Sequence, residues 1–307
     1  MDVTVAICSR NRATSLQNVL QSIKAATKPN NQWELLVVDN GSSDNTPDVV
    51  RSFANSLPVR YESEPKAGLS NARNRAISAA RGDYIVWTDD DVLVEPGWLV
   101  AYTRGFRQWP DAAVFGGKII PILTGPTPEW FLRATPFVQP ALAARDLGDE
   151  PAALTIDGDR LPWGANFAVR RAEQAQALYD PLLGVAPGRR RVGEETQVVK
   201  AILKKGTGRW LPDCAVKHVI DHDRQTIKYL ANYYEAQGAT AAFLEPRPTD
   251  ALLFNAPRWL WKSACTKWLA FGKAWATEPP EVWVPKLKFA AEDWGRLKYF
   301  RTSIQGL

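Results

Sequence analysis

Short apolar runs alternate with helical patterns over the first third of the chain, and this alternation constrains the fold more than any other feature. Five runs rich in β-branched residues predict strands at 3–8, 33–38, 59–62, 84–88 and 113–120. Patterns with helical spacing lie between them, at about 13–26, 44–55, 69–80 and 96–109. Strands that alternate with helices favour an α/β fold, in which right-handed crossovers build a mostly parallel, Rossmann-like sheet flanked by helices.

Polar clusters follow three of these strands, at 9–12, 39–43 and 89–91. Ligands of parallel sheets bind beyond the carboxyl ends of the strands, so we expect the three clusters on one rim. The consecutive Asp89, Asp90 and Asp91 repel one another unless a cation or a strong donor lies near. The pair Asp89 and Asp91 therefore predicts a Mg²⁺ or Mn²⁺ site that also holds substrate phosphates. A solvated acidic turn is the alternative.

Composition bounds the class of protein. The chain has 307 residues, 45% of them hydrophobic, which is enough for one large domain or a domain with an extension. It contains neither an apolar run of membrane-spanning length nor a signal-peptide pattern, so we expect a cytoplasmic protein. Cys8, Cys214 and Cys265 lack the spacing of a zinc site or a disulfide framework. We expect three ordinary buried thiols.

The last part of the chain differs from the rest. Residues 251–307 hold nine Lys+Arg against four Asp+Glu, and six of the thirteen tryptophans. Trp261, Trp268 and Trp275 recur every seven residues, which predicts an aromatic stripe on a basic helix. We expect prolines at 279, 280 and 285 to end this helix before a further short amphipathic segment. The stripe could pack on the preceding domain, form a dimer seam, or lie in the headgroup layer of a membrane.

Six ordered motifs resemble those of the family 2 glycosyltransferases. They are VAICSRNR at 5–12, LLVVDNGSSD at 35–44, GLSNARN at 68–74, WTDDD at 87–91, WGANFAVRR at 163–171 and GEET at 193–196. The resemblance covers roughly residues 3–225. It implies a GT-A catalytic domain over 1–225, with a nucleotide-sugar half over about 1–118 and an acceptor half over about 119–225. A helical, basic, Trp-rich extension would then follow over 226–307.

The resemblance also implies an activity. Such enzymes move a sugar from a nucleoside-diphosphate donor, here expected to be a UDP-sugar, to an acceptor hydroxyl with inversion at the anomeric carbon. A divalent metal, Mn²⁺ or Mg²⁺, usually stabilises the leaving diphosphate as a Lewis acid. We expect a glycan or lipid-linked acceptor, no nucleic-acid partner, and a cytoplasmic location that could be peripheral on the inner face of a membrane.

The resemblance assigns metal ligands and donor contacts. Asp91 would bind the metal and Asp89 the ribose or donor sugar, while Asp90 would be oriented away from the metal. His218 would be a further metal ligand, in preference to the nearby His222. Neutral imidazole can join carboxylates on Mn²⁺. A structural histidine is the alternative for both positions.

Further donor contacts would come from the ends of the first two strands. Asp39 would accept a hydrogen bond from the nucleotide base, and its alternative role is to cap the turn that follows it. Ser9, Arg10 and Arg12 would lie beside the base, with Arg10 where the family often has an aromatic residue. Arg73 would contact the diphosphate. Arg75 would face elsewhere.

The acidic pair Glu194 and Glu195 would supply the general base, with Glu195 as the first candidate and Glu194 as the alternative. Both could instead serve only the dipole of a helix start. Trp163 and Asn166 would floor the sugar pocket, against core packing as the alternative for Trp163. The basic run 189–191 is either a solvated loop or a lid over the donor.

Two other functions stay open at this stage. A nucleotidyltransferase on a similar sheet would use the same aspartates, but it should need a lysine-rich loop after the first strand, which residues 12–15 lack. A non-catalytic protein that binds glycans or membranes would keep the fold without needing Glu195. Turnover of a sugar nucleotide separates this second alternative from an enzyme.

Overall fold

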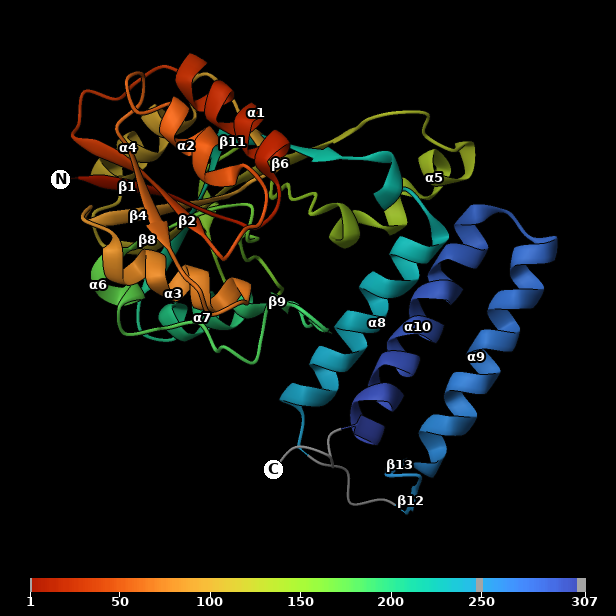
Figure 1. The fold of residues 1–307 in the computed structure, drawn as a ribbon. Coiled ribbons are helices and arrows are strands. Elements are labelled where there is room, and N and C mark those ends of the chain that lie inside the picture. Colours follow the sequence, from red (N-terminus) through yellow and green to blue (C-terminus); the bar gives the residue numbers. More distant parts are fainter. Residues whose placement is uncertain (1, 247–250, 303–307) are drawn as a thin grey trace. The chain divides into compact units, whose positions relative to one another are not determined.

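The computed structural model describes residues 2–246 and 251–302 (Figure 1). The chain divides into two compact units. The first unit comprises Met1–Ile122, Ala143–Arg189 and Gly193–Val219. The second unit comprises Leu123–Leu142, Arg190–Val192 and Ile220–Leu307.

A parallel set of strands forms one half of the sheet in the first unit. These strands, in spatial order, are β3 (Val59–Ser63), β2 (Trp33–Asp39), β1 (Val3–Ser9) and β4 (Tyr84–Asp89). The central strands are buried along nearly their whole length, as expected where helices cover both faces of a sheet. The predicted strands at these four positions are therefore confirmed.

The other half of the sheet contains antiparallel pairs. β8 (Asn166–Arg170) is antiparallel to both β4 and β6 (Ala112–Leu123), so β6 runs in the same direction as the parallel strands. The long β11 (Thr207–Ile220) pairs with the short strands β5 (Val92–Val94) and β7 (Ala152–Ala153). In the described residues the sheet has nine strands. The prediction of a mostly parallel α/β sheet flanked by helices is confirmed.

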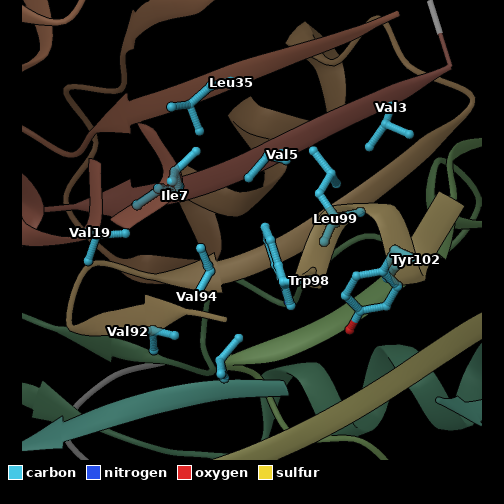
Figure 2. Packing of buried hydrophobic residues seen from close by; sticks show 14 of the residues in the cluster. Val3, Val5, Ile7, Val19, Leu35, Val92, Val94, Trp98, Leu99 and Tyr102 are labelled. Carbon is cyan, nitrogen blue, oxygen red and sulfur yellow. The ribbon is translucent and has the colours of Figure 1, made fainter. Parts of the chain in front are cut away.

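Side chains of the central strands alternate between two buried clusters, one for each face of the sheet. In β1, Val5 and Ile7 join the cluster shown in Figure 2, whereas Ala6 between them joins the other. In β4, Val86 joins the first cluster and Trp87 the second. This period of two follows from the pleat of a strand, and it explains why the strands read as continuous apolar runs.

Helices cover both clusters (Figure 1). The helices of the first face are α1 (Ala13–Ala25), α2 (Thr46–Ser52) and α4 (Trp98–Gln108). The helices of the second face are α3 (Leu69–Ala79), α6 (Arg171–Gln174) and α7 (Glu194–Leu203). The sequence predicted α1, α2, α3 and α4, with bounds that differ from the observed ones by a few residues. The resulting three layers fix the ends of β1, β2 and β4, where the candidate site lies.

The segment that follows β6 is rich in proline but contains short helices. It carries α5 (Glu129–Ala134) and two short 3-10 helices, η1 (Thr135–Phe137) and η2 (Gln139–Leu142). Pro128 precedes α5, and Pro136 lies within the first two positions of η1, where a missing N–H costs nothing. Beyond it, a hairpin of β9 (Val185–Ala186) and β10 (Arg189–Arg190) precedes α7.

Three helices make up most of the second unit. α10 (Pro280–Thr302) packs against both α8 (Ile227–Leu244) and α9 (Arg258–Thr277). A Cβ added at Gly238 would lie 1.9 Å from Glu292 O, and one added at Gly295 would lie 2.0 Å from Glu235 O. The two glycines thus allow the backbones of α8 and α10 to touch. The predicted helical C-terminal extension is therefore confirmed.

The prolines act differently from the prediction. α9 ends at Thr277 before the Pro279–Pro280 pair, but Pro285 lies inside α10 and ends no helix. It is the sixth residue of α10, so it removes one backbone bond close to the helix start, and packing on α8 and α9 holds the remaining turns. The predicted short segment is therefore a helix of 23 residues.

The Trp stripe is split between packing and solvent. Trp261 donates to Leu253 O at 2.8 Å, in the hairpin of β12 (Leu252–Leu253) and β13 (Ala256–Pro257), and Trp268 contacts Phe271. Trp275 is 57% exposed. Cys265 is also exposed, so the expectation of three buried thiols is wrong for this residue; Cys214 is buried and Cys8 is intermediate. No helix of residues 2–246 and 251–302 is long and apolar enough to span a membrane.

Candidate active site

The carboxyl ends of β1, β2 and β4 lie side by side and carry the three predicted polar clusters. The register pairs Ser9 with Asp39 across β1 and β2, and Cys8 with Asp89 across β1 and β4. Asp90 and Asp91 follow in the turn between β4 and β5. The expected polar rim is therefore confirmed.

Asp90 is turned into the protein. Ser9 Oγ donates to its Oδ2 at 2.7 Å, and Arg12 Nη1 lies 3.0 Å from its Oδ1. Burial raises the pKa of Asp90 to about 7, although the charge of Arg12 acts in the opposite direction. Both carboxylate oxygens are thus engaged within the rim, and so is the hydroxyl of Ser9.

Asp91 faces both Arg12 and His218. Arg12 Nη2 donates to Asp91 Oδ2 at 3.0 Å, and His218 Nε2 lies 3.4 Å from Asp91 Oδ1. The strand pairing of β5 with β11 explains this neighbourhood, since Val92 pairs with His218 and Val219 N donates to Asp91 O. The sequence suggested the two candidate ligands separately, and the pairing of β5 with β11 brings them together.

The donor types fit a divalent cation that is shared with a substrate. Asp91 offers a carboxylate and His218 an imidazole, a combination that suits Mn²⁺, while Mg²⁺ prefers oxygen ligands. Five carboxylates and two guanidinium groups line this part of the first unit, so its formal charge is negative; they are Asp89, Asp90, Asp91, Glu194, Glu195, Arg12 and Arg73. In the described part of the chain, no three His, Cys, Asp or Glu residues form a ready-made cage. A metal here would therefore need oxygens from the substrate.

Arg73 connects the aspartate cluster with the acidic pair. It is 4% exposed, its Nη1 donates to Glu194 Oε1 at 2.7 Å, and its Nη2 lies 3.6 Å from Asp89 Oδ1. Glu195 Oε2 lies 3.8 Å from Nη1. The guanidinium also lies over the ring of Tyr179, 5.3 Å from its centroid. Arg73, which was predicted to contact the diphosphate, thus contacts carboxylates of the protein in this structure.

The two members of the acidic pair have different surroundings. The side chain of Glu194 is 7% exposed and bound to Arg73, whereas that of Glu195 is 18% exposed. Burial and the neighbouring charge of Glu195 raise the pKa of Glu194 to about 8, against the opposing effect of Arg73. Both lie in the first turn of α7, where the helix dipole favours acids. Glu195 is thus the more accessible carboxylate of the pair.

Gly164 leaves room for this arrangement. A Cβ added there would lie 3.1 Å from Arg73 Nη2 and 3.3 Å from Glu195 Cδ. Its neighbour Trp163 is partly buried against the first cluster, and the guanidinium of Arg145 lies 4.8 Å from its ring centroid. Part of the Trp163 side chain thus packs on the core, which agrees with core packing as the alternative role of this residue.

Asn166 is a structural residue in this arrangement. It is fully buried, and its Nδ2 donates to the carbonyls of Lys118 and Cys214. Its Oδ1 accepts from Trp98 Nε1 and Tyr102 OH, each at 2.9 Å. These four bonds use the whole capacity of the amide, so a direct contact with a donor sugar would have to break one of them.

Asp39 is engaged as its alternative role predicted. Its Oδ1 accepts from Ser42 N at 2.9 Å, and its Oδ2 accepts from Tyr61 OH at 2.7 Å. A carboxylate oxygen accepts more than one bond, so both oxygens keep acceptor capacity for a base. Arg10 is exposed beside this turn. Sequence reasoning missed Tyr61 and Tyr179, because both pair with site residues only through the fold.

The basic run before α7 has protein partners. Arg189 donates to Pro181 O at 2.6 Å. In the second unit, Arg190 lies over Tyr229 and Arg191 lies over the ring of Phe243 at 4.4 Å. This run is therefore not a freely solvated loop.

Comparisons with known proteins agree with this architecture. The family model described as glycosyl transferase family 2 matches residues 4–137. The glucosyl-dolichyl phosphate glucuronosyltransferase of Haloferax volcanii is 28% identical over 134 residues, which cover 43% of this chain and 42% of that protein. The chain thus matches less than half the length of that relative.

Two solved structures share the fold. TarS 1–349 of S. aureus, in complex with UDP, has 14% sequence identity and a TM-score of 0.58, covering 97% of this chain and 91% of that one. The mannosyltransferase PcManGT of Pyrobaculum calidifontis, in complex with GDP-Man and Mn²⁺, has 18% identity and a TM-score of 0.58, covering 95% and 86%. The segment that carries β1, β2 and β4 is thus similar to glycosyl transferase family 2, whose model it matches over residues 4–137.

Proposed function

We propose that this chain is an inverting glycosyltransferase that moves a sugar from a nucleoside-diphosphate donor, a UDP-sugar, to a hydroxyl of a glycan or lipid-linked acceptor. One observation carries the proposal: Asp89 at the end of β4 and the acids that open α7 converge on the buried guanidinium of Arg73. An acidic group for the leaving diphosphate and its metal thus lies beside a candidate base. The lipid-linked alternative draws support from the dolichyl phosphate in the name of the Haloferax relative.

The donor would bind at the strand ends. In this proposal Asp39 accepts from the base, Arg10 and Arg12 flank the nucleotide, and Asp89 contacts the ribose or the sugar. Asp91 and His218 hold the metal, which when bound stabilises the negative charge on the diphosphate as a Lewis acid. UDP in the TarS structure and GDP-Man with Mn²⁺ in PcManGT support this choice of ligands, each for its own protein.

Glu195 would act on the acceptor. Its carboxylate takes the proton of the acceptor hydroxyl while that oxygen bonds to the anomeric carbon, and the bond from this carbon to the phosphate oxygen breaks. Attack from the face opposite the leaving group inverts the anomeric centre. The greater exposure of Glu195 favours it over Glu194, whose carboxylate is held by Arg73.

We further infer that residues 1–225 perform the chemistry, with the donor half over about 1–118 and the acceptor half over about 119–225, while 226–307 form an extension that contacts an anionic membrane face. α9 carries four basic residues and no acidic one. Lys262 and Lys273 are exposed together with Trp259, Leu269 and Trp275. Cationic and apolar side chains on one helix are what a headgroup layer binds.

A donor panel tests the proposed activity. Nucleotide release is measured from UDP-, GDP- and dTDP-sugars with Mn²⁺, Mg²⁺ or EDTA, for the wild type and for Asp91→Ala. We expect turnover of a UDP-sugar that EDTA abolishes and that Asp91→Ala greatly reduces. Absence of metal-dependent turnover on every donor contradicts the proposal, as does full activity of Asp91→Ala.

A further inference from the structure

One face of α3 holds the part of the chain that leads into α7. Ser70 Oγ donates to Leu183 O at 2.8 Å. Asn74 exchanges two bonds with the backbone of Tyr179, since its Nδ2 donates to Tyr179 O at 2.8 Å and its Oδ1 accepts from Tyr179 N at 2.9 Å. Arg73, which is on the same helix α3, donates a hydrogen bond to Glu194 of α7. Residues three and four apart share a helix face, so the GLSNARN motif works as one clamp.

Arg73 is the member of this clamp that reaches the reacting groups. Its guanidinium is buried, lies on the ring of Tyr179, and has carboxylates from two elements at its nitrogens. Glu194 and Glu195 come from α7, and Asp89 comes from the end of β4. A planar guanidinium fixes such neighbours in direction as well as distance, which the point charge of a lysine does not. Arg73 thus lies between the acidic pair and Asp89 of the aspartate cluster.

We propose that Arg73 is a positioning residue for the base: it places Glu195 against the aspartate end of the site, through its bond to Glu194, and does not bind the diphosphate. This inference rests on the proposed function. Three observations carry it: Arg73 is 4% exposed, its Nη1 is bound to Glu194, and its Nη2 faces Asp89. A diphosphate that bound Arg73 would have to take the guanidinium away from this acidic environment.

A positioning role and a diphosphate-binding role of Arg73 predict opposite effects of Arg73→Lys. This substitution keeps the positive charge but loses the planar guanidinium with its two parallel donors. A positioning role lowers kcat about tenfold or more, because a misplacement of the base by about 1 Å slows the reaction strongly. The Kd for UDP with Mn²⁺ then stays within about twofold of the wild-type value, since the substitution leaves the contacts that bind UDP in place. A diphosphate contact would instead weaken UDP binding about tenfold or more and leave the base in place.

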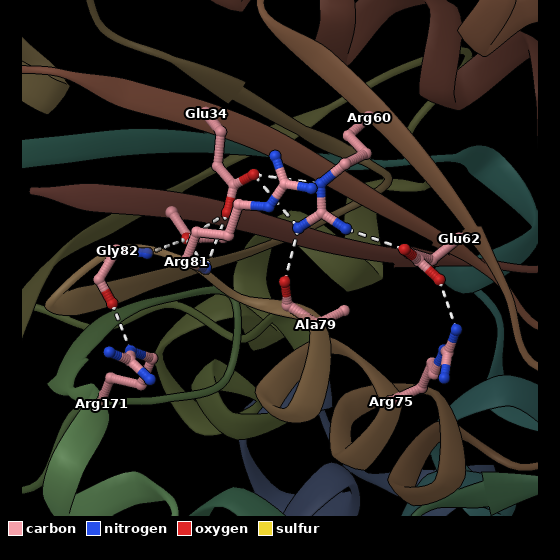
Figure 3. A network of polar contacts seen from close by, with 9 residues as sticks. Glu34, Arg60, Glu62, Arg75, Ala79, Arg81, Gly82 and Arg171 are labelled. Carbon is pink, nitrogen blue, oxygen red and sulfur yellow. Dashed lines mark hydrogen bonds and ion pairs between the residues drawn. The ribbon is translucent and has the colours of Figure 1, made fainter. Parts of the chain in front are cut away.

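Arg75→Met is the matched control. Arg75 lies two positions further along α3, its side chain is 45% exposed, and its Nη2 donates to Glu62 Oε2 at 2.6 Å (Figure 3). This bond belongs to a network of Glu34, Arg60 and Glu62 at the other end of the helix (Figure 3). We expect wild-type kcat and wild-type UDP binding for this variant.

The experiment measures kcat and donor KM by nucleotide release, UDP binding by calorimetry and folding by thermal melting. Glu194→Gln and the double variant Arg73→Lys/Glu194→Gln complete a cycle. Because both residues act through Glu195, the double variant should lose no more of kcat than Arg73→Lys alone, within about twofold. Weakened UDP binding with kcat preserved, or losses of kcat that multiply in the double variant, overturn the inference.

Failure of the proposed function has a different signature. A wild type that neither binds UDP nor releases nucleotide contradicts the glycosyltransferase itself. An active wild type whose Arg73→Lys variant matches Arg75→Met in kcat contradicts only the role of Arg73. If Arg73→Lys melts far below the wild type, UDP binding at a temperature below its transition still separates a loss of the diphosphate contact from a displaced base.

Discussion

His218 Nε2 lies 3.4 Å from Asp91 Oδ1, although the two residues are far apart in the sequence. The antiparallel pairing of β5 with β11 creates this contact, because it sets His218 opposite Val92. A carboxylate and an imidazole thus meet at the end of β4, beside the aspartate that faces Arg73.

We predict that Asp91→Ala and His218→Ala each weaken Mn²⁺ binding, measured by calorimetry in the presence of UDP. The protein supplies few ligands, so the loss of one should raise the Kd about tenfold or more. His222→Ala is the control, since His222 lies in η3 (His222–Arg224) of the second unit. Equal Kd values for the wild type and His218→Ala would remove this histidine from the metal site.

The raised pKa of Glu194 predicts that the free energy of unfolding depends on pH. Its ordinary pKa of 4.5 is raised to about 8 in the folded chain, so the folded state keeps a proton that the unfolded state has lost. The contribution of Glu194 to stability is therefore present below pH 4.5 and declines as the pH rises through 8, by at most about 1.4 kcal/mol for each pH unit.

Urea unfolding of the wild type and of Glu194→Gln at pH 5 and pH 8 measures this effect. The variant does not titrate here, so its stability relative to the wild type should improve between the two pH values. Asp90→Asn should show the same direction, because burial raises the pKa of Asp90 to about 7. A stability difference that is independent of pH for Glu194→Gln would show that this carboxylate is ionised in the folded chain.

Asn166→Ala should destabilise the first unit. The substitution leaves Trp98 Nε1, Tyr102 OH and the carbonyls of Lys118 and Cys214 without their bonds to the amide. Each buried polar group that is left without a hydrogen-bond partner destabilises the fold by about 1–3 kcal/mol. We therefore expect the free energy of unfolding to fall by about 3 kcal/mol or more. Asn30→Ala, at an exposed position, should change it by less than about 0.5 kcal/mol. A loss for Asn166→Ala as small as that of the control contradicts its role as a buried anchor.

Binding to vesicles tests the membrane contact of α9. We expect the protein to sediment with phosphatidylcholine vesicles that contain anionic phosphatidylglycerol, and less so as salt is added. Lys262→Glu/Lys273→Glu should reduce this binding about tenfold or more, since each basic residue near the surface contributes about 1 kcal/mol. Lys204→Glu on the first unit is the control. Failure to sediment, or equal binding by the double variant, argues for a protein partner on α9 or for none.

The parallel half of the fold follows from local sequence patterns. β1, β2 and β4 are short apolar runs, and the polar residues after them mark the ends of the strands. The position of Asp39 beside Ser9 follows directly from parallel pairing in register. Long-range antiparallel pairing has no such local signal, so the contact of His218 with Asp91 was not predictable as a contact.

The contacts of Arg73 show the same limit. Its motif could be recognised, but helical spacing gave no partner, and the chemistry of a guanidinium suits phosphates and carboxylates equally. Only the fold brings α7 and β4 to the same side chain. Pro285 shows a different limit, because a proline near a helix start is tolerated when neighbouring helices supply packing.

The base assignment is tested most directly by comparing Glu195→Gln with Glu194→Gln in donor turnover with Mn²⁺. Both variants keep the shape of the side chain, and UDP binding by calorimetry reports whether the donor site is intact. We predict that Glu195→Gln lowers kcat about 10²- to 10⁴-fold with unchanged UDP binding, and that Glu194→Gln loses clearly less. Wild-type kcat in Glu195→Gln would contradict the account.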